Sequence, residues 1–244
     1  MFILLIISKI NKYLTNAGGL PHLRFKSILK GGSAVNSNIK ISGLLMGCSF
    51  LLTACGGSST GSSSFETIVS EGRAILDQYG AAAATDPANM PTTGTATYNG
   101  AAAYSSDYSS AADIVQYAET VSDVTLTADF ANSTVTGTAD NFHTVSTPNV
   151  TLSGSLSLNG TISGNSFSTD LNGTVTETLT GLTGAQAAYN GTQVPFTYTG
   201  STSGVFVGSA AEAFLAVGTG TGTATFLGEN ISETVNAAFG GVQD

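Results

Sequence analysis

The clearest pattern in this sequence is Val150-Thr151-Leu152-Ser153-Gly154-Ser155-Leu156-Ser157-Leu158. Apolar residues or Gly stand at every second position, and Thr or Ser stands between them. A period of two places the apolar side chains together on one face of a β-strand. One apolar face and one Ser/Thr face indicate an antiparallel sheet that covers a core on one side and meets water on the other.

The same texture recurs from Thr93 to the C-terminus. We expect further strands at 95–104, 121–130, 134–142, 161–171, 173–182, 194–200, 214–219, 221–227 and about 234–239. The pairs Asn159-Gly160, Asn172-Gly173 and Asn190-Gly191 predict turns between strands, and the Gly/Thr run from Gly218 to Gly222 predicts a hairpin turn. Nine or ten short strands with almost no helix between them indicate an all-β sandwich or a closed barrel. Closure is favoured because these strands lack the Lys residues that usually protect sheet edges.

One helix is predicted before the strands, at 65–79. Its apolar stripe is formed by Phe65, Ile68, Val69, Gly72, Ile75, Leu76 and Tyr79. These residues recur at helical spacing, Ser63 and Glu66 are spaced as a capping box, and Gly80 can end the helix. We expect this stripe to pack on the rest of its own domain.

Charge is strongly segregated along the chain. Six of the seven Lys and Arg residues precede Cys55, whereas all sixteen Asp and Glu residues follow it. After Cys55, Arg73 is therefore the only Lys or Arg. This acidity excludes nucleic acid as a partner, because phosphate backbones require basic surfaces. It remains compatible with a basic protein partner, a cation, or simple adaptation to a salty medium.

A short motif, Leu52-Thr53-Ala54-Cys55, resembles the lipobox of bacterial lipoproteins. Lys40 and an apolar segment at 41–52 precede it. That segment has the length of a signal-peptide core, about 7–15 residues, and is shorter than the about 20 residues of a spanning helix. The resemblance implies that the chain is cut before Cys55 and acylated (palmitate) at Cys55, which anchors it to a membrane. The alternative is a lone Cys in an apolar core segment.

These features divide the chain into four parts. We expect a lipoprotein signal region at 1–54, whose translation start is set too far upstream; a lipidated Cys55 with a flexible Gly/Ser tether at 55–64; a helix and linker at 65–92; and a β-domain at 93–244. Cys48 falls within the signal region, so no pair of Cys remains for a disulfide in the exported part. Gly56, directly after the lipidated Cys, fits sorting to the outer membrane.

Three segments of the β-domain resemble the barrel of transferrin-binding protein B-type surface lipoproteins. They are Thr125 to Gly137, which matches a strand–turn–strand pattern; Gly204 to Glu212, which matches a G-x-F-x-G-x-x-A-E segment; and Ala238-Phe239-Gly240-Gly241, which matches the close of the last strand. After Glu212, Phe214-Leu215-Ala216 stands where that family usually has a Gly-Gly pair.

The resemblance implies a single up-and-down barrel of about eight strands with a packed interior. It further implies an outer-membrane lipoprotein, at the cell surface, that binds a ligand without catalysis. The partner would be a host iron protein, haem or another solute. Transferrin itself is not expected, because the chain has room for one barrel only and no Lys-rich face.

Three alternatives stay open. The chain could be a structural or adhesive surface protein without a small-molecule ligand, such as a β-solenoid, although its Gly positions lack a fixed period. It could be an integral outer-membrane barrel, although it lacks aromatic girdles. An enzyme is the least favoured, because no catalytic, cofactor or metal constellation is recognisable: His143 is isolated, and Asp129 and Asp140 are expected at strand ends, in solvent.

Overall fold

The computed structural model describes residues 64–145 and 150–244. The expected signal region at 1–54, the predicted acylation site Cys55 and the predicted tether up to residue 63 lie outside the described residues.

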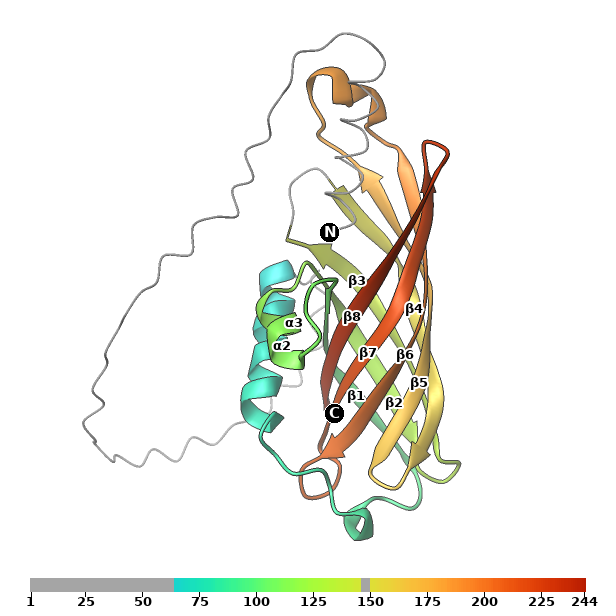
Figure 1. Cartoon of the computed structure of the whole chain (residues 1–244). Coiled ribbons are helices and arrows are strands. Elements are labelled where there is room, and N and C mark those ends of the chain that lie inside the picture. Colours follow the sequence, from blue (N-terminus) through green and yellow to red (C-terminus); the bar gives the residue numbers. More distant parts are fainter. Residues whose placement is uncertain (1–63, 146–149) are drawn as a thin grey trace, which may run out of the picture.

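Eight antiparallel strands form a closed barrel in which each strand pairs with its neighbours in the sequence (Figure 1). They are β1 Thr95–Ser105, β2 Thr120–Asp129, β3 Thr134–Thr144, β4 Val150–Ser163, β5 Ser166–Leu179, β6 Gln193–Val207, β7 Ala213–Phe226 and β8 Glu229–Gln243. Pairing of β1 with β8 from Tyr98↔Gln243 to Ser105↔Asn236 completes the closure. The predicted all-β up-and-down barrel of eight strands is confirmed, and the sandwich and solenoid alternatives are wrong.

Several predicted turns are wrong, because the strands are longer than the alternation suggested. Asn159-Gly160 lies within β4 and Asn172-Gly173 within β5, and the hairpin between these strands turns at residues 164–165 instead. The Gly-rich run 218–222 is also mid-strand, so two predicted runs join into β7. A Cβ on Gly160 would overlap the carbonyl oxygen of Ser168 on β5. Gly is therefore needed there because two backbones pass closely, and not because the chain turns.

The alternation of the strands fills the barrel with apolar side chains. Leu126 on β2, Leu158 on β4 and Leu171 on β5 are fully buried in this core, together with the rings of Phe206 and Phe214. The outward residues of β4, such as Thr151, Ser153 and Ser157, are exposed. This is the reverse of an integral outer-membrane barrel, in which the outer surface is apolar.

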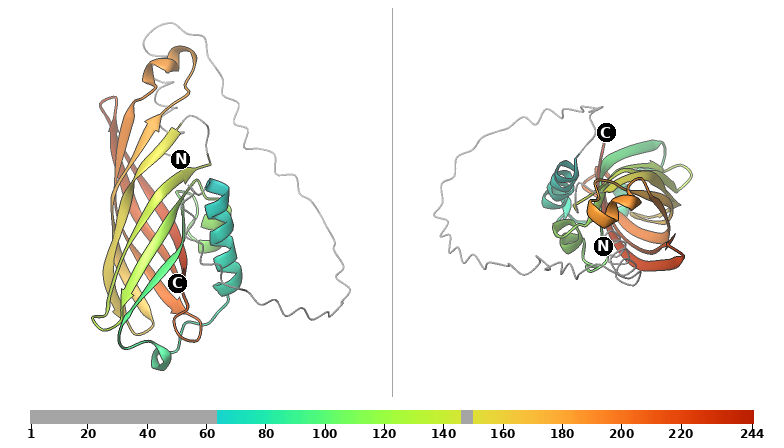
Figure 2. Two further views of the ribbon diagram at one scale, coloured as in Figure 1. Left: turned by 180° about the vertical axis from the view of Figure 1, so that it is seen from behind. Right: turned by 90° about the horizontal axis from the view of Figure 1, so that it is seen from above.

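Two helices cover part of the barrel's outer surface (Figure 2). The helix α2 Phe65–Tyr79 has the predicted bounds, but its N-cap is Ser64, whose Oγ accepts a hydrogen bond from the N–H of Thr67 at 3.3 Å. The short helix α3 Ala111–Gln116, capped by Ser110, was not predicted. Both helices bury apolar side chains against small outward residues of β1 and β8. This cluster contains Ile68, Val69, Ile114, Val115, Ala101, Ala103 and Ala238.

One end of the barrel is plugged by the chain that leads into β1. A short 3-10 helix, η1 Pro87–Asn89, precedes Met90, which is buried in the core. Beside it, the hydroxyl of Tyr98 donates a hydrogen bond to the carbonyl oxygen of Ala211 at 2.8 Å. The opposite end carries the 3-10 helix η2 Gly184–Tyr189, which projects beyond the strands (Figure 1). Among the helices of the described residues, none has the length and hydropathy to cross a membrane.

Two Gly-to-Ala substitutions test this account of the glycines. We expect Gly160→Ala to lower the free energy of unfolding by about 1–3 kcal/mol, because the new methyl group overpacks two strands. In contrast, a Cβ on Gly72 of α2 would make ordinary contacts, 3.6 Å from Ala101 and 3.8 Å from Val115. Gly72→Ala should stabilise by about 0.5–1 kcal/mol through helix propensity. Urea unfolding measures both, and an unchanged stability of Gly160→Ala would contradict the close-approach argument.

Candidate functional site

A cavity of about 70 Å³ lies inside the barrel, toward the end that carries η2. All eight strands contribute to its lining. Its most distinctive side chains are four aromatic rings, Tyr104, Phe142, Phe196 and Tyr198, and two carboxylates, Glu177 and Glu233. We refer to it as the carboxylate cavity.

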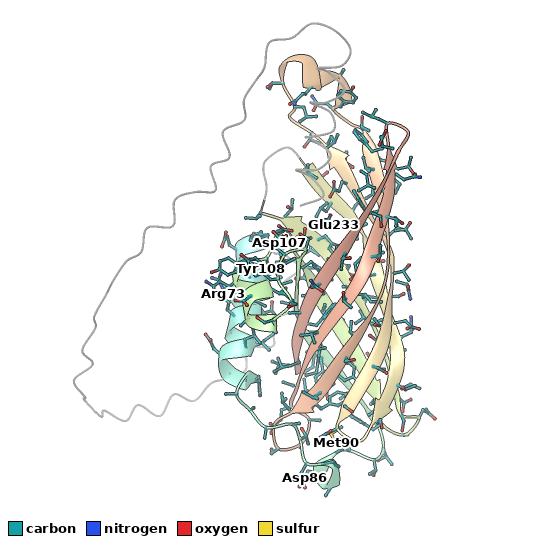
Figure 3. The ribbon with its side chains drawn as sticks, viewed as in Figure 1. Arg73, Asp86, Met90, Asp107, Tyr108 and Glu233 are labelled. Atoms are coloured by element: carbon teal, nitrogen blue, oxygen red, sulfur yellow. The ribbon has the colours of Figure 1, made fainter. Side chains whose placement is uncertain are left out.

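The two carboxylates occupy positions that the strand pattern reserves for apolar side chains. Glu177 lies on β5 between Val175 and Leu179, and Glu233 lies on β8 between Ile231 and Val235. Residues two apart share a face of a strand, so both Glu side chains point into the barrel with their apolar neighbours. Figure 3 places Glu233 in the half of the barrel away from Met90.

Both carboxylates are buried without a full set of hydrogen-bond partners. Glu177 is 5% exposed, and its Oε2 has no partner among the described residues. Glu233 is half-buried as a whole, but both of its carboxylate oxygens are buried and lack a partner there. Buried carboxylates are costly unless paired, so these groups oppose stability in the protein alone.

The surroundings favour the neutral form of these acids. Burial, with a contribution from the charge of Glu233, raises the pKa of Glu177 to about 7. Burial also raises the pKa of Glu233, and the charges of Glu119 and Asp107 act in the same direction. Glu119 lines the same cavity. The carboxylate cavity therefore gathers acidic groups in an apolar setting, where a positive ligand would favour their charged form.

Two of the aromatic rings of the cavity are held in place by hydrogen bonds and a ring contact. The hydroxyl of Tyr198 donates to the carbonyl oxygen of Val235 at 3.2 Å, and that of Tyr104 lies 3.1 Å from Ser122 Oγ. Tyr104 also packs on Phe142, with 5.7 Å between ring centroids. The two rings thus form an apolar part of the lining, on strands that neighbour those of Glu177 and Glu233.

The barrel wall divides beside the cavity. Pairing between β3 and β4 stops at Ala139↔Leu156, although β3 continues to Thr144 and β4 begins at Val150. Phe142 and Leu152 lie on these ends, which pair with β2 and β5 respectively but not with each other, and both residues line the cavity.

A second, larger hollow of about 640 Å³ lies outside the barrel, between α2 and the strand surface. Its lining includes Ile75, Leu76, Leu215 and Val217, and no described residue of the lining carries a charge. It offers apolar surface and the hydroxyls of Ser and Thr residues, but no charged group that would select an ion. We therefore take the carboxylate cavity as the candidate site.

The structure gives structural roles to the other residues considered in the sequence. Glu212 accepts hydrogen bonds from Ser209 N at 3.0 Å and Ser209 Oγ at 2.6 Å, and thus caps the turn between β6 and β7. Asp129, at the end of β2, similarly accepts from Asn132 in the next turn.

The remaining candidates do not assemble into a site. His143 lies on β3 with Nε2 3.1 Å from Asn141 Oδ1, and Asp140 lies within β3 rather than at its end. The described residues contain no group of three or more His, Cys, Asp or Glu residues that could hold a metal ion. Cys55, the one predicted modification site, is outside the described residues and stays a prediction.

Sequence reasoning missed Glu177 and Glu233, although a signal was present. The two strands contain Val175-Thr176-Glu177-Thr178-Leu179 and Ile231-Ser232-Glu233-Thr234-Val235. In each, Glu stands in phase with the apolar positions, and the residues out of phase are Ser or Thr. A charged residue on the apolar face of a strand should have been recognised as a buried acid.

Comparison with known proteins gives one family and a set of similar solved structures. A protein-family profile described as "C-lobe and N-lobe beta barrels of Tf-binding protein B" matches residues 90–243. The solved structure of intact Ap-TbpB, with N and C lobes, is 21% identical with a TM-score of 0.35. A double mutant of the vaccine antigen transferrin-binding protein B from Haemophilus parasuis Hp5 is 22% identical with a TM-score of 0.35. Each match covers 66% of this chain but only 28% of the solved chain. No curated protein matches.

The buried carboxylates predict an unusual dependence of stability on pH. The pKa of Glu177 is about 7 in the folded chain, against about 4.3 for an ordinary Glu. Between these two pKa values the folded state binds more protons than the unfolded state does. The free energy of unfolding should therefore fall as pH rises from about 5 to 8, by roughly 3 kcal/mol at most. Glu233 acts with the same sign, whereas the lowered pKa values of Asp129 and Glu212 matter only at lower pH.

Urea unfolding at several pH values measures this slope. Glu177→Gln should flatten it, because the titrating group is gone. The matched control Glu229→Gln removes an exposed acid from the start of the strand that carries Glu233, and it should leave the slope unchanged. An equally steep slope in Glu177→Gln would contradict the burial of this carboxylate.

Proposed function

The chain belongs to the family of the C-lobe and N-lobe β-barrels of Tf-binding protein B, and from this premise we propose a function. The protein is a lipid-anchored lipoprotein of the bacterial outer membrane, displayed at the cell surface. Its barrel binds a ligand in the carboxylate cavity and catalyses no reaction.

The observation that supports a binding role is that two acidic side chains are buried without a full set of hydrogen-bond partners. Three carboxylate oxygens, of Glu177 and Glu233, are buried inside the barrel without partners among the described residues. Buried carboxylates without partners lower the stability of the fold. Such destabilising groups are expected at functional sites, and they are difficult to explain by a role in core packing. Among the described residues that line the cavity, none is His, Lys or Cys. A Ser of the lining could act as a nucleophile only with a general base, and the lining provides no candidate for that base except the carboxylates.

The volume of the cavity limits the size of the ligand that it can hold. Pockets for drug-sized ligands measure about 300–1,000 Å³. The carboxylate cavity, at about 70 Å³, is far smaller. Of the partners expected from the resemblance, a small solute fits this cavity better than haem does.

Anchoring rests on Cys55 and the tether that follows it. The outward side chains of β4 are largely Ser and Thr, so this part of the wall offers no apolar surface to lipid. Nine Gly, Ser, Thr residues, 56–64, separate the Cys from α2. Linkers of this composition and length have in general a mean extension of roughly 15–18 Å, which would suffice to hold the barrel beside a membrane surface. Several acyl chains together give stable attachment, because each buried CH₂ contributes about 0.8 kcal/mol.

An adhesive role, without a small ligand, is the second candidate. The exposed rings of Tyr108 and Tyr117 stack with 4.7 Å between their centroids, beside α3. Figure 3 shows Arg73 and Tyr108 on this helical side of the barrel. Tyr and Arg dominate the binding energy of many protein interfaces, so this surface suits a protein partner.

Substitution of the predicted lipidation site tests the anchor. Cys55→Ala should release the protein from the membrane fraction and abolish labelling with radioactive palmitate. The matched control Cys48→Ala, within the predicted signal region, should stay anchored and labelled. Retention of Cys55→Ala through high-salt and carbonate washes would refute the lipoprotein assignment.

Display at the surface has its own test. Protease added to intact cells should degrade the wild-type protein while a periplasmic marker survives. Protection of the protein until the outer membrane is permeabilised would place it on the periplasmic side instead.

A further inference from the structure

We propose that the carboxylate cavity binds a small primary ammonium ion, the protonated form of a short aliphatic amine. Its N–H groups donate hydrogen bonds to Glu177 and Glu233, and its alkyl group lies against the aromatic rings of the lining. This inference deepens the proposed function, because it names the ligand class of the same site.

The count of hydrogen-bonding atoms carries the argument. The acceptors without partners among the described residues are Glu177 Oε2, Glu233 Oε1 and Glu233 Oε2. A primary ammonium group has three N–H donors and no acceptor. It would thus satisfy all three oxygens and add no buried acceptor of its own. Glu177, at 5% exposed, cannot instead be satisfied by free contact with solvent.

The charges of the residues that line the cavity also favour a cationic ligand. Glu177, Glu233 and Glu119 line the cavity, and among the described residues of the lining there is no Lys, Arg or His. Arg73 is the one Lys or Arg of the described residues, and it lies exposed on α2, outside the barrel (Figure 3). A bound cation would therefore supply the positive charge that this part of the chain does not provide.

The aromatic side chains complete the fit. Phe142 and Phe196 give apolar contact for a short alkyl group, and the ring faces of Tyr104 and Tyr198 attract a cation. The hydroxyls of both Tyr residues already interact with Ser122 and Val235, so they need not compete for the ligand. A neutral alcohol would gain the apolar contact but leave two buried charges unpaired.

Volume and coordination separate this ligand from a metal ion. About 70 Å³ holds on the order of five water molecules, so an amine of a few heavy atoms fits. Calcium needs six to eight oxygen ligands, whereas the described residues contain no group of three or more His, Cys, Asp or Glu side chains placed so that they could hold a metal ion together. The cavity thus favours an organic cation that is held by few oxygens and by apolar contact.

Binding should depend on pH because it requires the charged carboxylates. Four other titratable groups line the cavity with Glu177: Glu233 on β8, Glu119 before β2, Tyr104 on β1 and Tyr198 on β6. The charge of Asp107 also acts on Glu233. None of the acids is assisted by a cationic side chain in the lining. Affinity should therefore rise as pH increases from about 6 to 8, while the amine stays protonated because its pKa is near the 10.4 of Lys.

Calorimetric titration of the full-length protein in nonionic detergent tests the proposal. The probe is ethylammonium chloride at pH 8, with ethanol as a neutral analogue of similar shape and tetramethylammonium as a cation without N–H donors. We expect one ethylammonium per chain, at least tenfold weaker binding of both analogues, and at least fivefold weaker ethylammonium binding at pH 6.

Variants assign the binding to the cavity. Glu177→Gln and Glu233→Gln should each weaken ethylammonium binding at least tenfold, whereas Glu229→Gln should bind as the wild type does. Glu177→Leu serves as the folded control: it should unfold at a higher temperature than the wild type and bind no ethylammonium. It separates a lost ligand contact from a lost fold.

The outcomes are distinct. Absence of ethylammonium binding, equal binding of ethanol, or calcium binding in its place would overturn the ligand class. So would binding that Glu177→Gln and Glu233→Gln leave unchanged. None of these results touches the anchor, which the Cys55→Ala fractionation tests independently.

Discussion

Closure of the barrel by the pairing of β1 with β8 is the constraint on which the rest of the structure depends. The two backbones approach so closely that a Cβ on Gly100 would overlap the carbonyl oxygen of Gly240. Closure removes both sheet edges in a β-domain, residues 93–244, whose sequence contains no Lys to protect them. It also creates an interior that is shielded from water. This shielding raises the pKa values of Glu177 and Glu233.

The barrel and its accessory helix were predictable, but the lengths of the strands were not. Period-two alternation identified part of every strand, although the predicted run 161–171 spans the hairpin between β4 and β5. The stripe of α2 gave its bounds correctly. Turn chemistry was misleading, because Asn159-Gly160 and Asn172-Gly173 have the residues of a tight turn but serve close contacts between strands. The short helix α3 was missed because six residues are too few to establish a helical period.

The candidate site was less predictable than the fold. Its residues come from all eight strands, so their meeting depends on closure and register and leaves no local motif. Glu177 and Glu233 lie far apart in sequence, and only their phase with apolar neighbours marks them. Here the alternation rule fails in the manner expected of functional positions, because two charges replace apolar groups and reduce the stability of the barrel.

The most direct test of this account is the titration of the individual carboxyl groups of the ligand-free protein by carbon-13 NMR. The account predicts that Glu177 titrates at a pKa of about 7 and that the pKa of Glu233 is also raised. If both carboxyl carbons instead titrate near the ordinary Glu pKa of about 4.3, the acids are solvated and the closed, carboxylate-lined interior described above is wrong.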